Sequence, residues 1–158
     1  MLGGITDPNT AYLLVRGLKT FALRMQQHNA NGLALAAFLE THPKVRRVYY
    51  PGLVSHPSHP IARQQMRGFG GVVSFEIDGT LEQTSAFIDA LRIPYIAPSL
   101  GGVESLVAHP VTMTHAAMDP KARQEAGLTD GLLRMSVGIE DFSDLQAYMQ
   151  AGIERIGR

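Results

Sequence analysis

The chain has 158 residues, of which 45% are hydrophobic, and it carries 14 basic and 14 acidic side chains. This length suffices for one hydrophobic core, so we expect a single domain over residues 1–158. The balanced charge gives no overall field that would attract nucleic acid or an anionic membrane, and the lack of cysteine excludes disulfides, thiolate nucleophiles and iron–sulfur ligation. Because the sequence shows neither a leader pattern nor a membrane-spanning apolar run, we expect a cytoplasmic protein.

The first 40 residues are predicted to be helical and to link this domain to another. Asp7-Pro8 is typical of a helix start, with an N-cap followed by proline at the first helical position. Apolar or small residues then recur at spacings of three and four: Leu14, Leu18, Phe21, Met25, His28, Gly32, Leu35 and Leu39. The pattern indicates one long amphipathic helix, or two in series divided near Gly17, ending before Pro43.

Strands and helices alternate through the middle of the chain. A strand is expected over 45–50, then a turn-rich loop and a short helix over 61–66. The alternation in 72–77 predicts a half-buried strand, and Thr80 with Gln83 forms a capping box for the next helix.

The last third is predicted with less regular spacing. We expect a short strand over 94–97, a second over 104–107 within a structured loop, a small helix from Asp119 ended by Gly127, a strand from Leu132, and a final helix capped by Ser143 with Gln146. The order of elements indicates an α/β fold of two layers, in which a small sheet carries helices on one face.

Arg134 is the first candidate for a functional residue. It lies in the apolar stretch LLRMSVGIED, where alternation directs Leu133 and Met135 to one face and Arg134 and Ser136 to the other. A guanidinium offers two parallel donors to a carboxylate or phosphate, which suggests an anion clamp. The alternative from the residues alone is a salt bridge to Glu104 or Glu140, or an exposed arginine on an edge strand.

The other candidate motifs are weaker. Ser99-Leu100-Gly101-Gly102 offers backbone amides to a ligand, or is simply a turn. The spacing of His56 and His59 argues against a metal pair, and a triad of Ser105, His115 and Asp119 has no supporting motif. The lysines are Lys19, Lys44 and Lys121, none of them in the loop context of a Schiff-base lysine.

Five segments, taken in order, resemble the Cys/Met-metabolism family of pyridoxal-phosphate enzymes, which includes cystathionine gamma-synthase, cystathionine gamma-lyase and methionine gamma-lyase. They are RGLKT (16–20), VYYPGLVSHPSH (48–59), GFGGVVSFEI (68–77), PSLGGVESLVAHPVTMTH (98–115) and LLRMSVGIED (132–141). The resemblance extends over essentially the whole chain and matches the C-terminal part of that family. It implies the small, mainly antiparallel sheet with helices on one face that this part has in fold-type I enzymes.

The resemblance also implies roles for particular residues. Arg134 would bind the α-carboxylate of an amino-acid substrate, with Ser99 and Leu100 approaching the same group, and this contact would orient the bonds at Cα. The cofactor, pyridoxal 5'-phosphate, would be held by a lysine in a Ser-Ala-Thr-Lys-like motif that this sequence lacks. We therefore expect no catalytic, cofactor-binding or metal-ligating residue within the chain, and no activity without a cofactor domain or a full-length subunit.

Two questions remain open at this level. Many cystathionine-processing members have a glutamate just before the Ser-Leu-Gly-Gly motif, whereas this chain has Pro98, so synthase, lyase and sulfhydrylase activities are all compatible with it. The chain could instead be a non-catalytic interaction or oligomerisation module derived from the family. In either case we expect a homo-oligomer, because an apolar surface that includes Phe21, Met25 and Leu33 would lie exposed in an isolated domain.

Overall fold

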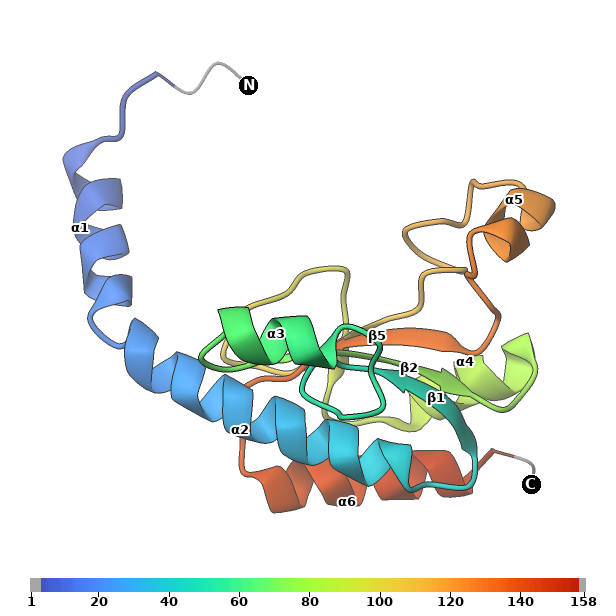
Figure 1. Cartoon of the computed structure of the whole chain (residues 1–158). Helices are drawn as coiled ribbons and strands as arrows, with labels where there is room; N and C mark the ends of the chain where they lie inside the picture. Colours follow the sequence, from blue (N-terminus) through green and yellow to red (C-terminus); the bar gives the residue numbers. More distant parts are fainter. Residues whose placement is uncertain (1–3, 157–158) are drawn as a thin grey trace.

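The computed structural model describes residues 4–156, which form six helices and one five-stranded sheet (Figure 1). The helices are α1 (Pro8–Leu18), α2 (Phe21–Glu40), α3 (His59–Gln65), α4 (Leu81–Ala90), α5 (Pro120–Glu125) and α6 (Phe142–Glu154). The strands are β1 (Val45–Tyr49), β2 (Val72–Ile77), β3 (Tyr95–Ile96), β4 (Leu106–Ala108) and β5 (Leu132–Ser136).

The sheet has the order β1-β2-β5-β4-β3 and is mainly antiparallel. β2 pairs antiparallel with β1 and β5, β5 pairs antiparallel with β4, and only β3 and β4 are parallel. β5 therefore lies in the centre of the sheet although it is the last of the five strands in the sequence. Side chains on β5 are flanked on both sides, which restricts where they point.

The core lies on one face of the sheet. Val73, Phe75 and Ile77 of β2 and Leu133 and Met135 of β5 point to this face and are almost completely buried. They pack against apolar residues of α2, α4 and α6, namely Leu35, Leu39, Phe87, Ile88, Leu145, Met149 and Ile153. Figure 1 shows α2 and α6 side by side along this face. The predicted two-layer α/β fold with helices on one face is confirmed.

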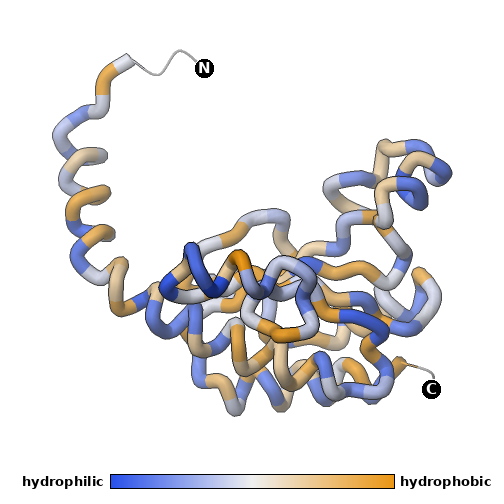
Figure 2. The backbone as a smooth tube through the Cα atoms, viewed as in Figure 1, coloured by the Kyte–Doolittle hydropathy of each residue, from blue (hydrophilic) through white to orange (hydrophobic). Residues whose placement is uncertain are grey.

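The N-terminal stretch forms two helices, the second of the two alternatives given by its periodicity. Asp7 caps α1, accepting hydrogen bonds from the amides of Asn9 (2.9 Å) and Thr10 (3.1 Å). α2 begins at Phe21, after a turn at Lys19 and Thr20. α2 buries its face around Leu35, whereas no residue of α1 is buried, and Figure 2 shows hydrophobic residues spaced along that protruding helix.

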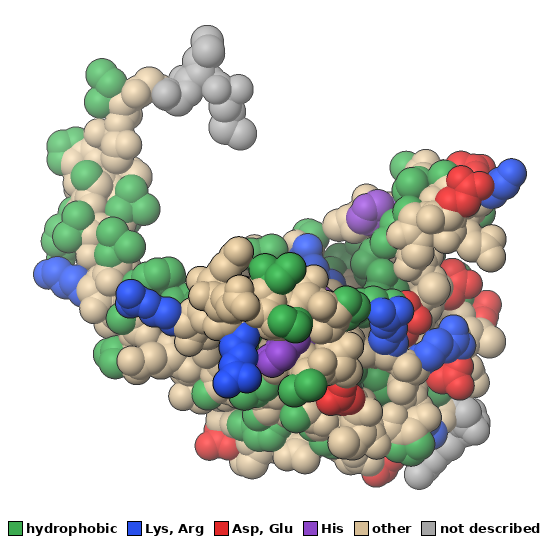
Figure 3. Space-filling model, in the orientation of Figure 1, with side chains coloured by type: hydrophobic (Ala, Val, Ile, Leu, Met, Phe, Trp, Pro, Cys, Tyr) green, Lys and Arg blue, Asp and Glu red, His purple; other side chains and the backbone are tan. Residues whose placement is uncertain are grey.

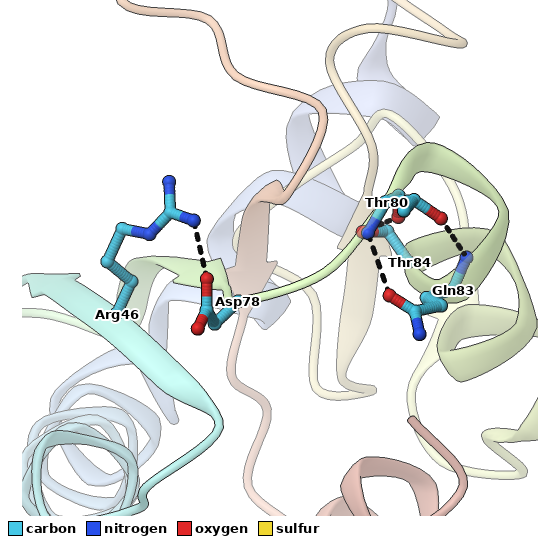
Figure 4. A network of polar contacts seen from close by, with 5 residues as sticks. All are labelled: Arg46, Asp78, Thr80, Gln83 and Thr84. Atoms are coloured by element: carbon cyan, nitrogen blue, oxygen red, sulfur yellow. Dashed lines mark hydrogen bonds and ion pairs between the residues drawn. The ribbon is translucent and has the colours of Figure 1, made fainter. Parts of the chain in front are cut away.

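Most predicted boundaries agree with the structure to within two residues. β2 has the predicted bounds, and Thr80 and Gln83 form both hydrogen bonds of the predicted capping box, visible in Figure 4. The cap of the last helix was predicted wrongly. Asp141, not Ser143, is the N-cap, because its carboxylate accepts from the Ser143 amide at 2.8 Å.

Two further features complete the surface. Within residues 4–156 the one ion pair is the exposed contact between Arg46 and Asp78 (2.5 Å, Figure 4). In the same range, no helix has the length and apolar character that crossing a membrane requires.

Candidate functional site

Arg134 lies in the middle of β5 on the face opposite the helices. Its neighbours across the sheet are Ser74 of β2 and Ala108 of β4, and Ser136 shares its face. The side chain is half-buried, whereas Leu133 and Met135 on either side of it are fully buried in the core. The alternation of the strand thus places the guanidinium outside the core, as the sequence pattern predicted.

The guanidinium contacts the backbone of the Ser-Leu-Gly-Gly loop. Nη2 of Arg134 donates to the carbonyl oxygen of Pro98 at 2.5 Å and to that of Ser99 at 3.3 Å. No carboxylate of residues 4–156 forms an ion pair with it. Its Nε is shielded from solvent and has no hydrogen-bond partner in this part of the chain. The alternative of a salt bridge to Glu104 or Glu140 is therefore not formed, the alternative of an edge strand is excluded by the central position of β5, and Nε is left as an unsatisfied buried donor.

The same loop is fastened to β5 at a second point. Gly101 adopts a φ of +81°, a conformation that favours glycine, and its amide donates to Oγ of Ser136 at 3.0 Å. Ser99 and Leu100 lie between these two attachment points and are exposed. The structure thus brings together Arg134, Ser99 and Leu100, three residues that are 35 positions apart at most in sequence.

Glu140 explains why Arg134 has no carboxylate partner. One carboxylate oxygen of Glu140 accepts from the amide of Ser105 at 2.5 Å and the other from its hydroxyl at 2.9 Å. The same hydroxyl accepts from the amide of Gly138 at 2.8 Å. Both carboxylate oxygens of Glu140 thus accept hydrogen bonds from Ser105, so neither is left to pair with Arg134.

Helix α2 fixes the turn that carries Glu140. The amide nitrogen Nδ2 of Asn31 donates to the carbonyl oxygens of Gly138 (3.1 Å) and Glu140 (2.8 Å). Nδ1 of His28 lies 2.7 Å from the carbonyl oxygen of Val137. A carbonyl only accepts, so Nδ1 of this buried histidine carries the proton. No role was predicted for Asn31. Its place three residues after His28, on the buried face of α2, is the feature that could have indicated one.

A pocket of about 270 Å³ opens beside this site. Its wall combines Leu100, Gly101 and Ser136 from the candidate site with Phe21, Met25 and His28 from α2. The wall is mainly apolar, although Ser136 and His28 contribute polar atoms. An apolar side chain bound next to Arg134 would find space in this direction.

The remaining candidates do not converge. Ser105 is bonded to Glu140, His115 lies beside the Thr114 hydroxyl, and Asp119 caps α5, so the triad drawn from the sequence is not assembled. His109 is buried, with Nε2 bound to the carbonyl of Asp130 at 2.9 Å, and burial lowers its pKa. Within the described chain, no three metal-ligating side chains gather.

The lysines lie apart from Arg134 and its loop. Nζ of Lys44 donates to the carbonyl oxygen of Ile156 at 2.5 Å and also contacts that of Ile153, so it caps the end of α6. Lys19 follows α1 and Lys121 is in the first turn of α5, and both side chains are exposed.

Comparison with known proteins gives one consistent answer. The family model of "Cys/Met metabolism PLP-dependent enzyme" matches residues 1–154. Cystathionine gamma-synthase 1, chloroplastic, of Nicotiana tabacum is 54% identical over 99% of this chain, and L-methionine gamma-lyase of Fusobacterium nucleatum subsp. polymorphum is 44% identical over 99%. The crystal structure of cystathionine gamma synthase from Xanthomonas oryzae pv. oryzae in complex with cystathionine superposes with a TM-score of 0.90 at 48% identity, over 98% of this chain.

The chain is much shorter than these relatives. It spans 29% of the tobacco protein, 40% of the Fusobacterium protein and 40% of the Xanthomonas chain. The matched range, residues 1–154, includes both the loop at Pro98 and the strand that carries Arg134. On this basis the chain belongs to the Cys/Met metabolism family of PLP-dependent enzymes.

Proposed function

We propose that Arg134, Ser99 and Leu100 form the site for the substrate carboxylate in a PLP-dependent enzyme of sulfur amino-acid metabolism, and that residues 1–158 are its C-terminal domain. The reaction would be γ-elimination or γ-replacement on cystathionine, a homoserine ester or methionine. The relatives named above include a gamma-synthase and a gamma-lyase, so their names leave the choice between the two reactions open.

The observation that carries the proposal is the buried Nε of Arg134, which has no hydrogen-bond partner among residues 4–156. Leaving a buried donor without a partner costs about 1 to 3 kcal/mol, so an acceptor that reached Nε would be favourable there. Nη2 of Arg134 holds the loop through Pro98, and Nε has no partner among residues 4–156, so the guanidinium has donor capacity beyond its contacts to the loop. The loop then supplies Ser99 and Leu100 at the same place, and the neighbouring pocket receives the side chain of the amino acid.

The described residues do not fit the cofactor itself. A Schiff-base lysine must lie unbonded beside the substrate, whereas Lys44 caps α6 and Lys19 and Lys121 are exposed on other elements. In this proposal the cofactor and its lysine belong to another domain or subunit, and the present chain supplies binding and orientation of the carboxylate. The chain alone would be inactive.

The exposed apolar residues support a partner of this kind. α1 and the start of α2 expose Tyr12, Leu13, Leu14, Val15, Leu18, Phe21 and Leu23, each by 49% or more. Figure 3 shows hydrophobic side chains along the whole protruding helix. A linking helix that packs against a cofactor domain would be expected to carry such residues.

The carboxylate site is tested by titrating the 158-residue chain with L-methionine, using NMR at constant ionic strength. We expect saturable shifts of the Arg134 Nε–H and Gly101 amide resonances. Arg134→Ala should abolish the Gly101 shift, while Arg46→Ala, which removes an exposed arginine paired with Asp78, should preserve it. Equal responses of the two variants would contradict the proposal.

Inactivity of the isolated chain is tested separately. After incubation with pyridoxal phosphate and gel filtration, the chain should retain no visible absorbance and release no 2-oxo acid from methionine or cystathionine. A yellow, active preparation would show that the chain needs no other domain.

The alternative is an interaction module without catalytic partners, which the exposed α1 also suits. Such a module would pair with itself or with full-length subunits and would have no use for the unpartnered Nε of Arg134. It is favoured if the chain self-associates but methionine causes no shift at Arg134.

A further inference from the structure

We propose that Glu140 is a positioning residue for this carboxylate site: acting through Ser105, it fixes the segment 98–105, whose loop presents Ser99 and Leu100 to a ligand. The inference rests on the proposed function of Arg134. Glu140, the acidic residue after β5, would then have a role although it neither touches the ligand nor belongs to the hydrophobic core.

The hydrogen bonds of Glu140 demand a carboxylate. One oxygen accepts from a backbone N–H and the other from a hydroxyl, both of Ser105. A carboxylate oxygen only accepts, so the Ser105 hydroxyl donates to Glu140 while its own oxygen accepts from the amide of Gly138. A glutamine would either place its NH2 group against the donating amide of Ser105 or donate to the Ser105 hydroxyl, whose O–H then loses its acceptor. A carboxylate is the side chain that accepts from both donors of Ser105.

The segment also has backbone hydrogen bonds, from the amide of Tyr95 to the carbonyl of Ser105 (3.0 Å) and from that of Ile139 to the carbonyl of Val103, and Glu140 adds a carboxylate contact at its far end. Near its start it is attached to β5 through Arg134 and through the hydroxyl of Ser136. At its far end Ser105 is fully buried, whereas Leu100, Val103 and Glu104 in between are exposed and contribute little packing. Fixing Ser105 therefore fixes the end from which the exposed loop extends.

Glu140 is itself held by the core. Its backbone carbonyl and that of Gly138 accept from Asn31 of α2, and the amide of Ile139 donates to the carbonyl of Val103 at 2.8 Å. Gly138 has no room for a side chain, since a Cβ would collide with the carbonyl oxygen of Val103. The position of the loop is thus set by α2, through the turn and the Glu140 carboxylate.

The test compares Glu140→Gln with Glu104→Gln in the 158-residue chain. Glu104 is an exposed carboxylate adjacent to Ser105 and serves as the matched control. Two quantities are measured by NMR: the hydrogen exchange rate of the Gly101 amide, with the Phe75 amide as a core reference, and the dissociation constant for L-methionine.

We expect Glu140→Gln to raise Gly101 exchange and to weaken methionine binding, each by about tenfold, as loss of one charge-assisted hydrogen bond predicts. Phe75 exchange should change much less, and Glu104→Gln should change none of these. Ser105→Ala, which keeps the backbone amide, should act in the same direction but more weakly, and it replaces Glu140→Gln should that variant not fold.

Two results would overturn the inference: unchanged Gly101 exchange in Glu140→Gln, or an equal rise at Gly101 and Phe75, which would indicate general destabilisation. Failure of the proposed function looks different. In that case the unsubstituted chain does not respond to methionine, while Gly101 exchange still rises in Glu140→Gln.

Discussion

Asn31→Asp probes the link between α2 and the turn after β5. Asn31 is 2% exposed, and its Nδ2 donates to two carbonyl oxygens, of Gly138 and of Glu140. Aspartate has the same shape but no donor when ionised. The substitution therefore replaces two hydrogen bonds by contacts between a carboxylate and two carbonyl oxygens, while the volume of the core stays constant.

The magnitude follows from these contacts. Two lost hydrogen bonds account for about 1 to 3 kcal/mol, and a buried charge that keeps only the Gln27 side-chain amide as donor brings the cost to about 3 to 5 kcal/mol at pH 7. The loss should become smaller near pH 4, because a protonated carboxyl can again donate to one carbonyl. A fall of this size is a large fraction of the 5 to 15 kcal/mol typical of a domain.

Asn29→Asp provides the control for this substitution. Asn29 lies two residues earlier on α2, and its Oδ1 accepts from the amide of Gly70 at 2.7 Å. A carboxylate there keeps its acceptor, so we expect a change below about 1 kcal/mol. Urea unfolding followed by circular dichroism at pH 7 and pH 4 measures both variants. The reasoning fails if the two substitutions cost the same, or if Asn31→Asp costs less than about 1 kcal/mol.

Three other perturbations test separate parts of the fold. Burial raises the pKa of Tyr50, whose hydroxyl donates to the Gly70 carbonyl, to about 12. Its contribution to the free energy of unfolding is therefore complete below the ordinary pKa of 10.0 and is lost as the pH rises to about 12. Tyr50→Phe should remove this pH dependence of the free energy of unfolding, measured with urea, between pH 10 and about 12. Burial lowers the pKa of His109, so its contribution to the free energy of unfolding is complete above pH 6.5 and is lost as the pH falls below that value. His109→Gln should reduce the fall of Tm at acid pH. Gly138→Ala should cost about 1 to 3 kcal/mol of unfolding free energy, because its Cβ has no space, and an unchanged urea midpoint would contradict that.

Elements governed by neighbouring residues were predictable from the sequence. The alternation of 72–77 gave β2 with its correct faces, and Thr80 with Gln83 gave the start of α4, because both depend on contacts within a few residues. The start of α6 shows the limit. Asp141 and Ser143 are both favourable caps, and the choice depends on the turn held by Asn31, over 100 residues away in sequence.

The candidate site residues came from the family resemblance, and their function stays a prediction. The motifs placed Arg134 with Ser99 and Leu100, and the structure brings the arginine within hydrogen-bond distance of the loop. Its relation to the acidic residues was not predictable, because Glu140 could pair with Arg134 or with Ser105 and the spacing allows both. The antiparallel pairing of β4 with β5 brings Ser105 to Glu140, so Glu140 bonds to Ser105 and not to Arg134.

The position of an arginine in an apolar strand now has a physical explanation. β5 separates two environments: Leu133 and Met135 face the core, and Arg134 faces the loop that begins at Pro98. An ammonium could satisfy one group of acceptors as a point charge, whereas a guanidinium donates in several fixed directions. Nη2 of Arg134 holds the loop and Nε has no partner among residues 4–156, so under the proposed function the same side chain organises the site and also binds a carboxylate. A lysine at this position would have to give up one of the two roles.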